Sequence, residues 1–318
     1  ATIPYIQVQQ CRGDHLTYDN STPYIYSATA YAAHSADILR RTACILGKTD
    51  DEKRYTELFE NIKRAFNDAW VNDDGSVSYY GEVSSQTAHC GESVALDGSV
   101  TRYTYYAENT PHCPSQTAYA LAVDFDLISK DKLKNTREYF KNSILRNNGK
   151  LTVGFLGISH LAPALSKVGL DDVAFKLLEQ EDNPSWLYSV KNGATTIWER
   201  WNSYIAETGT FGDVSMNSFN HYSYGAIGQW FFTDILGIRP VEIGYKSFML
   251  APKFGGGLTY AKGSFTSPYG KISSAWKLHD GKFTYDCTVP TNTTATLKLP
   301  NGDIHTLAGG SYHFEINV

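Results

Sequence analysis

The residues best suited to chemistry stand in one short run around Glu199. Trp198 precedes this acidic residue, and Arg200 and Trp201 follow it. Indole rings supply apolar walls and stacking faces for a ligand, and a guanidinium can orient or pair a carboxylate. The carboxylate could therefore act as a general base, or it could form a structural ion pair with Arg200 in a buried turn. The residues alone leave both interpretations open.

A second cluster of polar side chains among aromatic ones follows at residues 216–222. His221 could belong to a binding pocket, although a lone histidine is more often satisfied within a core. Asn217 or Ser218 could simply be the N-cap of a following helix. The intervening residues 204–215 contain glycines and few large aliphatic side chains, which predicts a loop. Such a loop would allow both clusters to converge on one cavity.

Other constellations are weaker. His89-Cys90 and His112-Cys113 match no standard zinc spacing, so a disulfide between the two cysteines, or no site at all, is favoured over a metal. The five cysteines are an odd number, which argues against a disulfide framework. No phosphate-binding glycine loop, nucleophile elbow or His-Glu-x-x-His motif is present. We therefore expect neither a cofactor nor a metal.

Composition excludes several classes of protein. The chain has 318 residues, which favours two domains, and 42% are hydrophobic and 19% charged, as in a folded protein. A net charge of -5 without a basic stripe predicts no nucleic-acid partner. No apolar run approaches the ~20 residues that a membrane helix needs, so no membrane partner is expected.

The N-terminus and the glycosylation sequons give information on the processing and cellular location of the protein. The N-terminus has neither an initiator methionine nor a visible signal peptide, so we expect a processed form or a fragment. Glycosylation sequons begin at Asn20 and Asn292 and slightly favour a secreted or periplasmic protein over a cytoplasmic one.

The first ~240 residues are predicted to form helices, and these helices must position the candidate residues. Apolar side chains recur there with the helical period. Gly47 separates a long helix expected at about 24–46 from a second one that buries apolar residues from Tyr55 to Trp70, and Thr49 with Glu52 suits a capping box for the second helix. Further helices are expected at 115–125, 130–146, 156–167, 171–180 and 218–236. Residues 72–114 break the pattern and are interpreted as an insertion.

The period then changes from 3.6 to 2. Alternating residues from 271 onward and an Asp280-Gly281 hairpin turn predict antiparallel strands, with a second turn at Asn301-Gly302. We therefore expect two domains, a helical one over 1–239 and a small antiparallel β-sandwich over 240–318. The helical segments are too few to close a ring of six hairpins, so the chain looks like the C-terminal part of something larger.

Several motifs resemble the inverting α-L-rhamnosidases of glycoside hydrolase family 78. They are GATTIWERW at 193–201, MNSFNHY at 216–222, SQTAYAL at 115–121, GFLGISHLAPALSKVG at 154–169, NPSW at 183–186, LAPKFGGGLTYAKGSF at 250–265 and SPYGKISSAW at 267–276. The resemblance covers nearly the whole chain except 72–114, and the combination is highly specific.

This resemblance implies part of an (α/α)6 helical barrel followed by a β-sandwich. It implies that Glu199 is the general base and that His221 contributes to the sugar pocket, with Trp198, Arg200 and Trp201 as further substrate-binding residues. His15 joins that set because it stands where the family usually has tryptophan in a Gly-Asp-Trp-Leu segment. Leu187 replaces a glycine that is common after the Pro-Ser-Trp run.

The acidic motif that carries the family's general acid is absent from this sequence. The leading interpretation is an inverting glycoside hydrolase that removes terminal α-L-rhamnose from glycosides or polysaccharides. Its acid would then come from an upstream segment or chain that completes the barrel. The alternatives are a non-catalytic carbohydrate-binding or degenerate relative of the same fold and, less favoured, a disaccharide phosphorylase.

Overall fold

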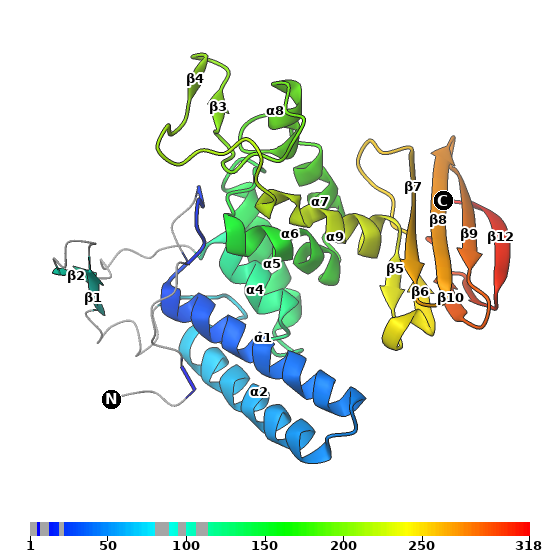
Figure 1. Ribbon diagram of the computed structural model, residues 1–318, viewed down its shortest axis with the longest axis horizontal. Coiled ribbons are helices and arrows are strands. Elements are labelled where there is room, and N and C mark those ends of the chain that lie inside the picture. The colour runs from blue at the N-terminus through cyan, green and yellow to red at the C-terminus, as the bar shows by residue number, and fades with distance from the viewer. Residues whose placement is uncertain (1–4, 7–12, 19–21, 80–88, 95–99, 106–113) are drawn as a thin grey trace. The chain divides into compact units, whose positions relative to one another are not determined.

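The structure is a computed structural model that describes residues 5–6, 13–18, 22–79, 89–94, 100–105 and 114–318 (Figure 1). The chain divides into two compact units, residues 1–170 and 171–318, which we describe separately. The division at 170 follows packing, whereas the predicted domain boundary at 240 follows the change in secondary structure. That boundary stays a prediction.

The first unit begins with a helical hairpin. Helices α1 (Tyr24–Ile45) and α2 (Thr49–Trp70) run antiparallel and pack along their length, as predicted (Figure 1). Gly47 ends α1 in the left-handed conformation that favours glycine, with φ of +66°. The expected capping box is wrong, because Lys48 is the N-cap of α2 and no side chain caps this helix. Thr49 is already the first helical residue, so its side chain is one position too late to cap.

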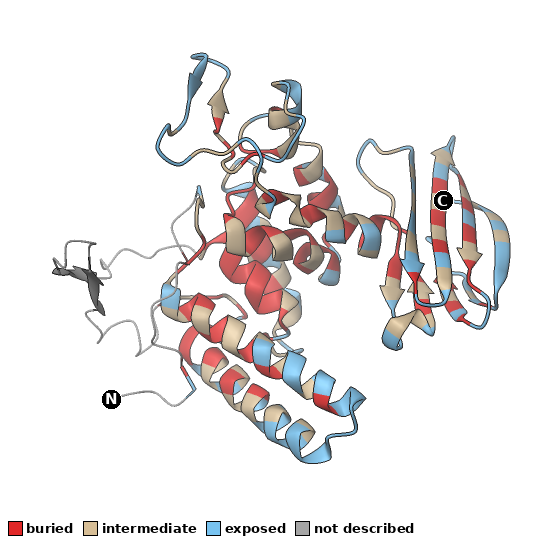
Figure 2. Cartoon of the chain, in the orientation of Figure 1, coloured by how far each residue is buried: buried red, intermediate tan, exposed pale blue. Residues whose placement is uncertain are grey.

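Helix α4 (Gln116–Asp124) is the centre of the first unit, since every residue from its start to Val123 is buried (Figure 2). The predicted N-cap at Ser115 is confirmed, because its side chain accepts from the backbone N–H of Ala118. Tyr26 of α1 reaches α4 and donates its hydroxyl to the Ala118 carbonyl at 2.9 Å. Helices α5 (Leu133–Leu145) and α6 (Phe155–Lys167) pack against α4.

Part of the predicted insertion forms a two-stranded antiparallel sheet. Its strands are β1 (His89–Val94) and β2 (Val100–Tyr105). His112 and Cys113 lie outside the described residues, and so do the predicted disulfide with Cys90 and its metal-binding alternative.

A buried carboxylate anchors the start of α6. Asp14 is only 4% exposed, and it accepts the Thr117 hydroxyl and the backbone N–H groups of Gly154, Leu156 and Gly157, the last three at 2.8–3.0 Å. The first N–H groups of a helix have no partner within the helix, so this carboxylate caps α6 from a distant part of the chain. Burial raises the pKa of Asp14, and these hydrogen bonds oppose that rise.

The second unit starts with short elements joined by long turns. They are α7 (Asp171–Leu178), α8 (Trp186–Lys191), β3 (Tyr204–Ile205), β4 (Thr210–Phe211), η1 (Ser223–Ile227), α9 (Gly228–Trp230) and η2 (Phe231–Ile235). The helix expected at 218–236 therefore begins only at Ser223, and it changes from 3-10 to α to π geometry. The alternative that Asn217 or Ser218 is an N-cap is wrong, because both residues precede the helix in a non-helical segment.

The rest of the second unit is a β-sandwich of two four-stranded sheets. One sheet has the order β11-β10-β6-β5, formed by β5 (Ile238–Pro240), β6 (Ser247–Leu250), β10 (Thr294–Lys298) and β11 (Ile304–Leu307). The other has the order β12-β9-β8-β7, formed by β7 (Tyr260–Ser267), β8 (Gly270–His279), β9 (Lys282–Val289) and β12 (Gly310–Asn317). These strands confirm the predicted sandwich.

Two details of the sandwich test the sequence analysis. Asp280 and Gly281 have φ of +50° and +73°, as the predicted two-residue hairpin turn requires. The pairing of β6 with β10 is parallel, so one contact departs from the expected antiparallel pattern. In the described part of the chain, no helix combines the length and apolar character needed to cross a membrane.

Candidate active site

Two segments of the second unit are tied together around the candidate residues. The backbone N–H of Glu199 donates to the Ser218 carbonyl at 2.8 Å, and the N–H of His221 donates to the Ile197 carbonyl at 2.8 Å. The Thr196 hydroxyl also donates to the carbonyl of Phe219. The segments that carry Glu199 and His221 are therefore neighbours, as the predicted intervening loop allows.

The two carboxylate oxygens of Glu199 differ in their surroundings. Oε2 accepts the backbone N–H of Ser218 at 2.8 Å, which fixes the orientation of the side chain. Among the residues that the structure describes, no protein group donates to Oε1. Glu199 is also half-buried, so its side chain still reaches solvent. Its carboxylate therefore has a fixed direction, and one oxygen remains free to bind a water molecule or a ligand.

The alternative of a structural ion pair between Glu199 and Arg200 is wrong. Nη1 of Arg200 lies 3.4 Å from Oδ2 of Asp213, and its Nε donates to Asn202 Oδ1 at 3.5 Å. Hydrogen bonds from the side chain and backbone of Ser215 hold the pKa of Asp213 below its usual value. Arg200 thus ties the base of the β3–β4 hairpin and leaves Glu199 without a cationic partner among the described residues.

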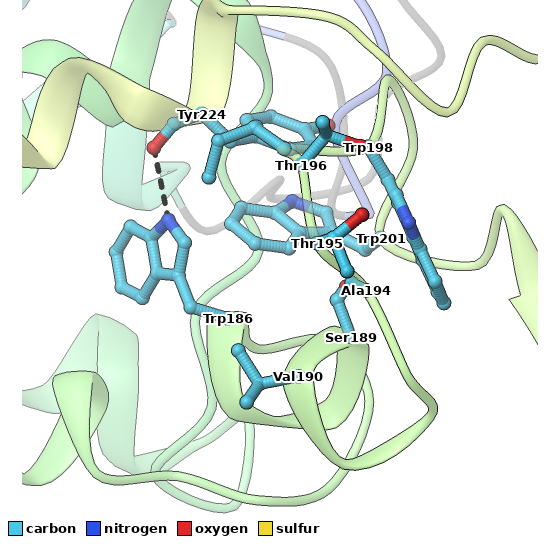
Figure 3. A pocket seen from close by; sticks show the side chains of 10 residues that line it. Trp186, Ser189, Val190, Ala194, Thr195, Thr196, Trp198, Trp201 and Tyr224 are labelled. Carbon is cyan, nitrogen blue, oxygen red and sulfur yellow. Dashed lines mark hydrogen bonds between the residues drawn. The ribbon is translucent and has the colours of Figure 1, made fainter.

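Both predicted tryptophans are buried in aromatic contacts. Trp198 is 6% exposed and meets Phe219 edge to face, with 5.2 Å between ring centroids. Trp201 is 2% exposed and stacks on Tyr224 at 3.8 Å, and Trp186 meets its edge at 5.4 Å (Figure 3). These rings form the supporting wall of the region, so Trp201 has one face already occupied by protein.

A cavity of about 260 Å³ lies beside this wall, between α8 and the segment before Glu199 (Figure 3). It is lined by Trp186, Ser189, Val190, Ala194, Thr195, Thr196, Ile197, Trp198, Trp201 and Tyr224. A hydrogen bond of 2.9 Å from Trp186 Nε1 to the Tyr224 carbonyl fixes one side of it. Glu199 and His221 do not line this cavity, so the pocket predicted to contain both of them stays a prediction.

The imidazole of His221 is half-buried and partly oriented. Its Nδ1 accepts the backbone N–H of Ser223 at 3.4 Å, and its ring lies parallel to Tyr222 at 5.7 Å. Acceptance at Nδ1 favours the tautomer that carries its proton on Nε2.

The structure places His15 in the first compact unit, at the start of α6. Its carbonyl accepts the backbone N–H of Phe155 at 2.9 Å, and its ring meets that of Phe155 edge to face at 5.4 Å. Glu199, Arg200, Trp198, Trp201 and His221 all belong to the second unit. A substrate-binding role for His15 stays a prediction.

Two residues whose contribution the sequence did not reveal also hold this site. Ser218 supplies the N–H that orients Glu199, and Asp213 takes the guanidinium that was expected to face Glu199. The signal at 217–218 was present but favoured a helix cap, because asparagine and serine are common in both settings. Within the described ranges, no group of three or more His, Cys, Asp or Glu side chains could hold a metal ion.

Family models assign the class of this protein. Residues 7–235 match the bacterial alpha-L-rhamnosidase six-hairpin glycosidase domain, and residues 237–313 match the bacterial alpha-L-rhamnosidase C-terminal domain. The fold is therefore that of a glycosidase built from helical hairpins and followed by β-sheets. The chain belongs to the bacterial α-L-rhamnosidase family, which confirms the resemblance and the fold class predicted from its motifs.

Individual relatives agree with this assignment. The chain is 34% identical over 311 residues to an α-L-rhamnosidase of Formosa agariphila, covering 98% of this chain and 29% of the relative. It is 37% identical over 288 residues to one of Streptomyces avermitilis, covering 91% and 24%. A solved structure of S. avermitilis α-L-rhamnosidase complexed with L-rhamnose matches with a TM-score of 0.84 at 32% identity, covering 99% of this chain and 29% of that one. The chain thus spans less than a third of these relatives.

Proposed function

We propose that the full-length protein containing this chain removes terminal α-L-rhamnose from glycosides or polysaccharides by an inverting displacement, with Glu199 as general base. One observation carries the assignment: Ser218 holds Oε2 of Glu199 at 2.8 Å, while Oε1 has no protein donor among the described residues. A base that deprotonates water needs this combination of a fixed direction and an open acceptor.

The proposed reaction is a single displacement. Oε1 of Glu199 takes a proton from the attacking water as the water oxygen forms a bond to the anomeric carbon. A second carboxyl group, about 6.5–9.5 Å away, protonates the departing glycosidic oxygen as its bond to that carbon breaks. The net result is hydrolysis with inversion at the anomeric carbon.

The substrate and the missing acid follow from the relatives. A similar protein has been solved with L-rhamnose bound, which supports a terminal rhamnose as the group removed. His221 would contribute to the sugar pocket, and the apolar side chains around Trp198 would suit the methyl group of a deoxy sugar. We further propose that an upstream segment or chain completes the helical barrel and provides the general acid, because this chain spans under a third of its relatives.

The test is Glu199→Gln in the full-length protein, assayed on an aryl α-L-rhamnoside in phosphate-free buffer. Glutamine keeps the shape and can still accept the Ser218 N–H, but it cannot take the proton from water. We expect kcat to fall by roughly 10²-fold or more. The product's anomeric configuration, followed by NMR, should be inverted, and turnover without phosphate distinguishes hydrolysis from phosphorolysis.

The matched control is Glu207→Gln, which neutralises an exposed glutamate in the nearby hairpin and should leave kcat unchanged. Unchanged turnover in Glu199→Gln would refute the assignment of the base. The alternative of a non-catalytic carbohydrate-binding relative predicts a different result: the wild-type protein would bind L-rhamnose by calorimetry but release no aglycone.

A further inference from the structure

The carbonyl of Ser203 accepts hydrogen bonds from two later residues of the chain near Glu199. It accepts the side-chain N–H of Asn217 (Nδ2) at 2.8 Å and the backbone N–H of Gly212 at 3.3 Å. Ser203 is fully buried, and its hydroxyl accepts the N–H of Arg200 at 3.1 Å. The turn directly after Glu199 is therefore tied to Asn217, which lies more than ten residues further along the chain.

The hydrogen bond between Asn217 and Ser203 connects two segments that both lead to Glu199. Asn217 is covalently joined to Ser218, whose N–H holds Oε2 of Glu199. Residues 206–212 between the two ends are all exposed, and Phe211 among them meets Phe219 edge to face at 5.7 Å between ring centroids. The Ser218 carbonyl is held by the N–H of Glu199 at 2.8 Å, and the hydrogen bond from Asn217 to Ser203 holds the residue on the other side of the Ser218 N–H.

The side-chain oxygen of Asn217 indicates a functional role for this residue rather than a stabilising one. Its Oδ1 is buried and has no hydrogen-bond partner among the described residues. A buried acceptor without a partner destabilises the folded state, so a side chain kept only for stability would serve poorly here. Truncation of Asn217 removes this unpaired oxygen together with the bond to Ser203, and the two effects on stability oppose each other.

We infer that Asn217 is a positioning residue for the proposed general base. It aligns the Ser218 N–H with Oε2 of Glu199, so that Oε1 faces the attacking water in a fixed direction. The inference rests on the proposed function, because it assigns Asn217 an effect only through Glu199. A misplacement of about 1 Å at a reacting group can lower a rate by ~10²-fold, which sets the scale of the effect.

The experiment is a double-mutant cycle of Asn217→Ala and Glu199→Gln in the full-length protein, with kcat, KM and Tm measured for each variant. Asn217→Ala should lower kcat by roughly ten- to a hundredfold, with KM within about twofold and Tm nearly unchanged. In the Glu199→Gln background the same change should have no further effect on kcat, because the group it positions no longer acts as a base. Asn217→Asp retains the size of the side chain and, when ionised, cannot donate to Ser203, so it should also lower kcat.

Asn192→Ala is the matched control. Asn192 makes the same type of bond, from Nδ2 to the Tyr188 carbonyl at 2.8 Å, at the end of α8. We expect it to leave kcat unchanged. Three outcomes would each overturn the role of Asn217. They are additive losses of kcat in the cycle, a higher KM at unchanged kcat, and activity lost only in step with Tm. An inactive Glu199→Gln with a fully active Asn217→Ala would overturn this inference alone, whereas a fully active Glu199→Gln would overturn the proposed function.

Discussion

Asp14 in the first unit and Glu199 in the second are carboxylates whose surroundings differ. Four donors reach the two oxygens of Asp14, which is 4% exposed. Glu199 is half-buried and, among the residues that the structure describes, accepts one N–H, from Ser218 at 2.8 Å, on Oε2.

The difference separates a carboxylate that stabilises a fold from one that is available for chemistry. Asp14 uses both oxygens to satisfy the first N–H groups of α6, so neither is left for a ligand. At Glu199 a single backbone bond sets the direction of the group, and the remaining oxygen keeps its capacity to accept a proton. The two carboxylates thus differ in how many of their lone pairs the described part of the protein already uses.

The largest expected effect on stability is that of Asp14→Ala. Its loss leaves the Thr117 hydroxyl and three backbone N–H groups at the start of α6 buried without an acceptor. We expect the free energy of unfolding to fall by on the order of 3–5 kcal/mol, measured by urea denaturation of the full-length protein. Asp73→Ala, at a fully exposed aspartate, is the control and should change it by less than ~0.5 kcal/mol. A loss below ~1 kcal/mol for Asp14→Ala would remove the contrast with Glu199.

Glu199→Ala should have a much smaller effect on stability. It removes one hydrogen bond from a half-buried group, so the free energy of unfolding should fall by at most about 1 kcal/mol. The same denaturation measurement checks this value. If Glu199→Ala destabilised the protein as much as Asp14→Ala, the carboxylate would be a structural element, and its open oxygen would have no functional meaning.

The smallest effect concerns the pH dependence of stability. Burial raises the pKa of Asp14 above its unfolded value, so the folded state binds the proton of this group more tightly than the unfolded state. Its contribution to stability is then fully present below about pH 4 and is lost as the pH rises through the folded pKa. The difference in unfolding free energy between wild type and Asp14→Asn should decrease over this window. An increase with pH would show that the four hydrogen bonds outweigh burial.

Helices and turns that depend on neighbouring residues were predicted well from the sequence. The apolar period predicted a first helix at 24–46, within one residue of the observed ends, and a second helix that buries residues up to Trp70, where the observed helix ends. Asp280-Gly281 predicted its hairpin turn, because few residue pairs tolerate two successive positive φ angles. The capping box at Thr49 failed because an N-cap requires one particular non-helical residue, and the pattern located the helix end only to within one position.

The amino-acid order alone was sufficient for the fold class, the family and the candidate base, because periodicity and motifs are properties of neighbouring residues. It did not decide the partner of Arg200, which proved to be Asp213 rather than the adjacent Glu199. Nor did it show that Ser218 donates its N–H to Glu199 and that the Asn217 side chain donates to the Ser203 carbonyl, instead of either residue capping a helix. These pairings depend on how the chain between residues 203 and 217 turns back, and adjacent side chains in an extended or turning segment often point apart. Tertiary structure therefore determined which oxygen of Glu199 is held and which remains open.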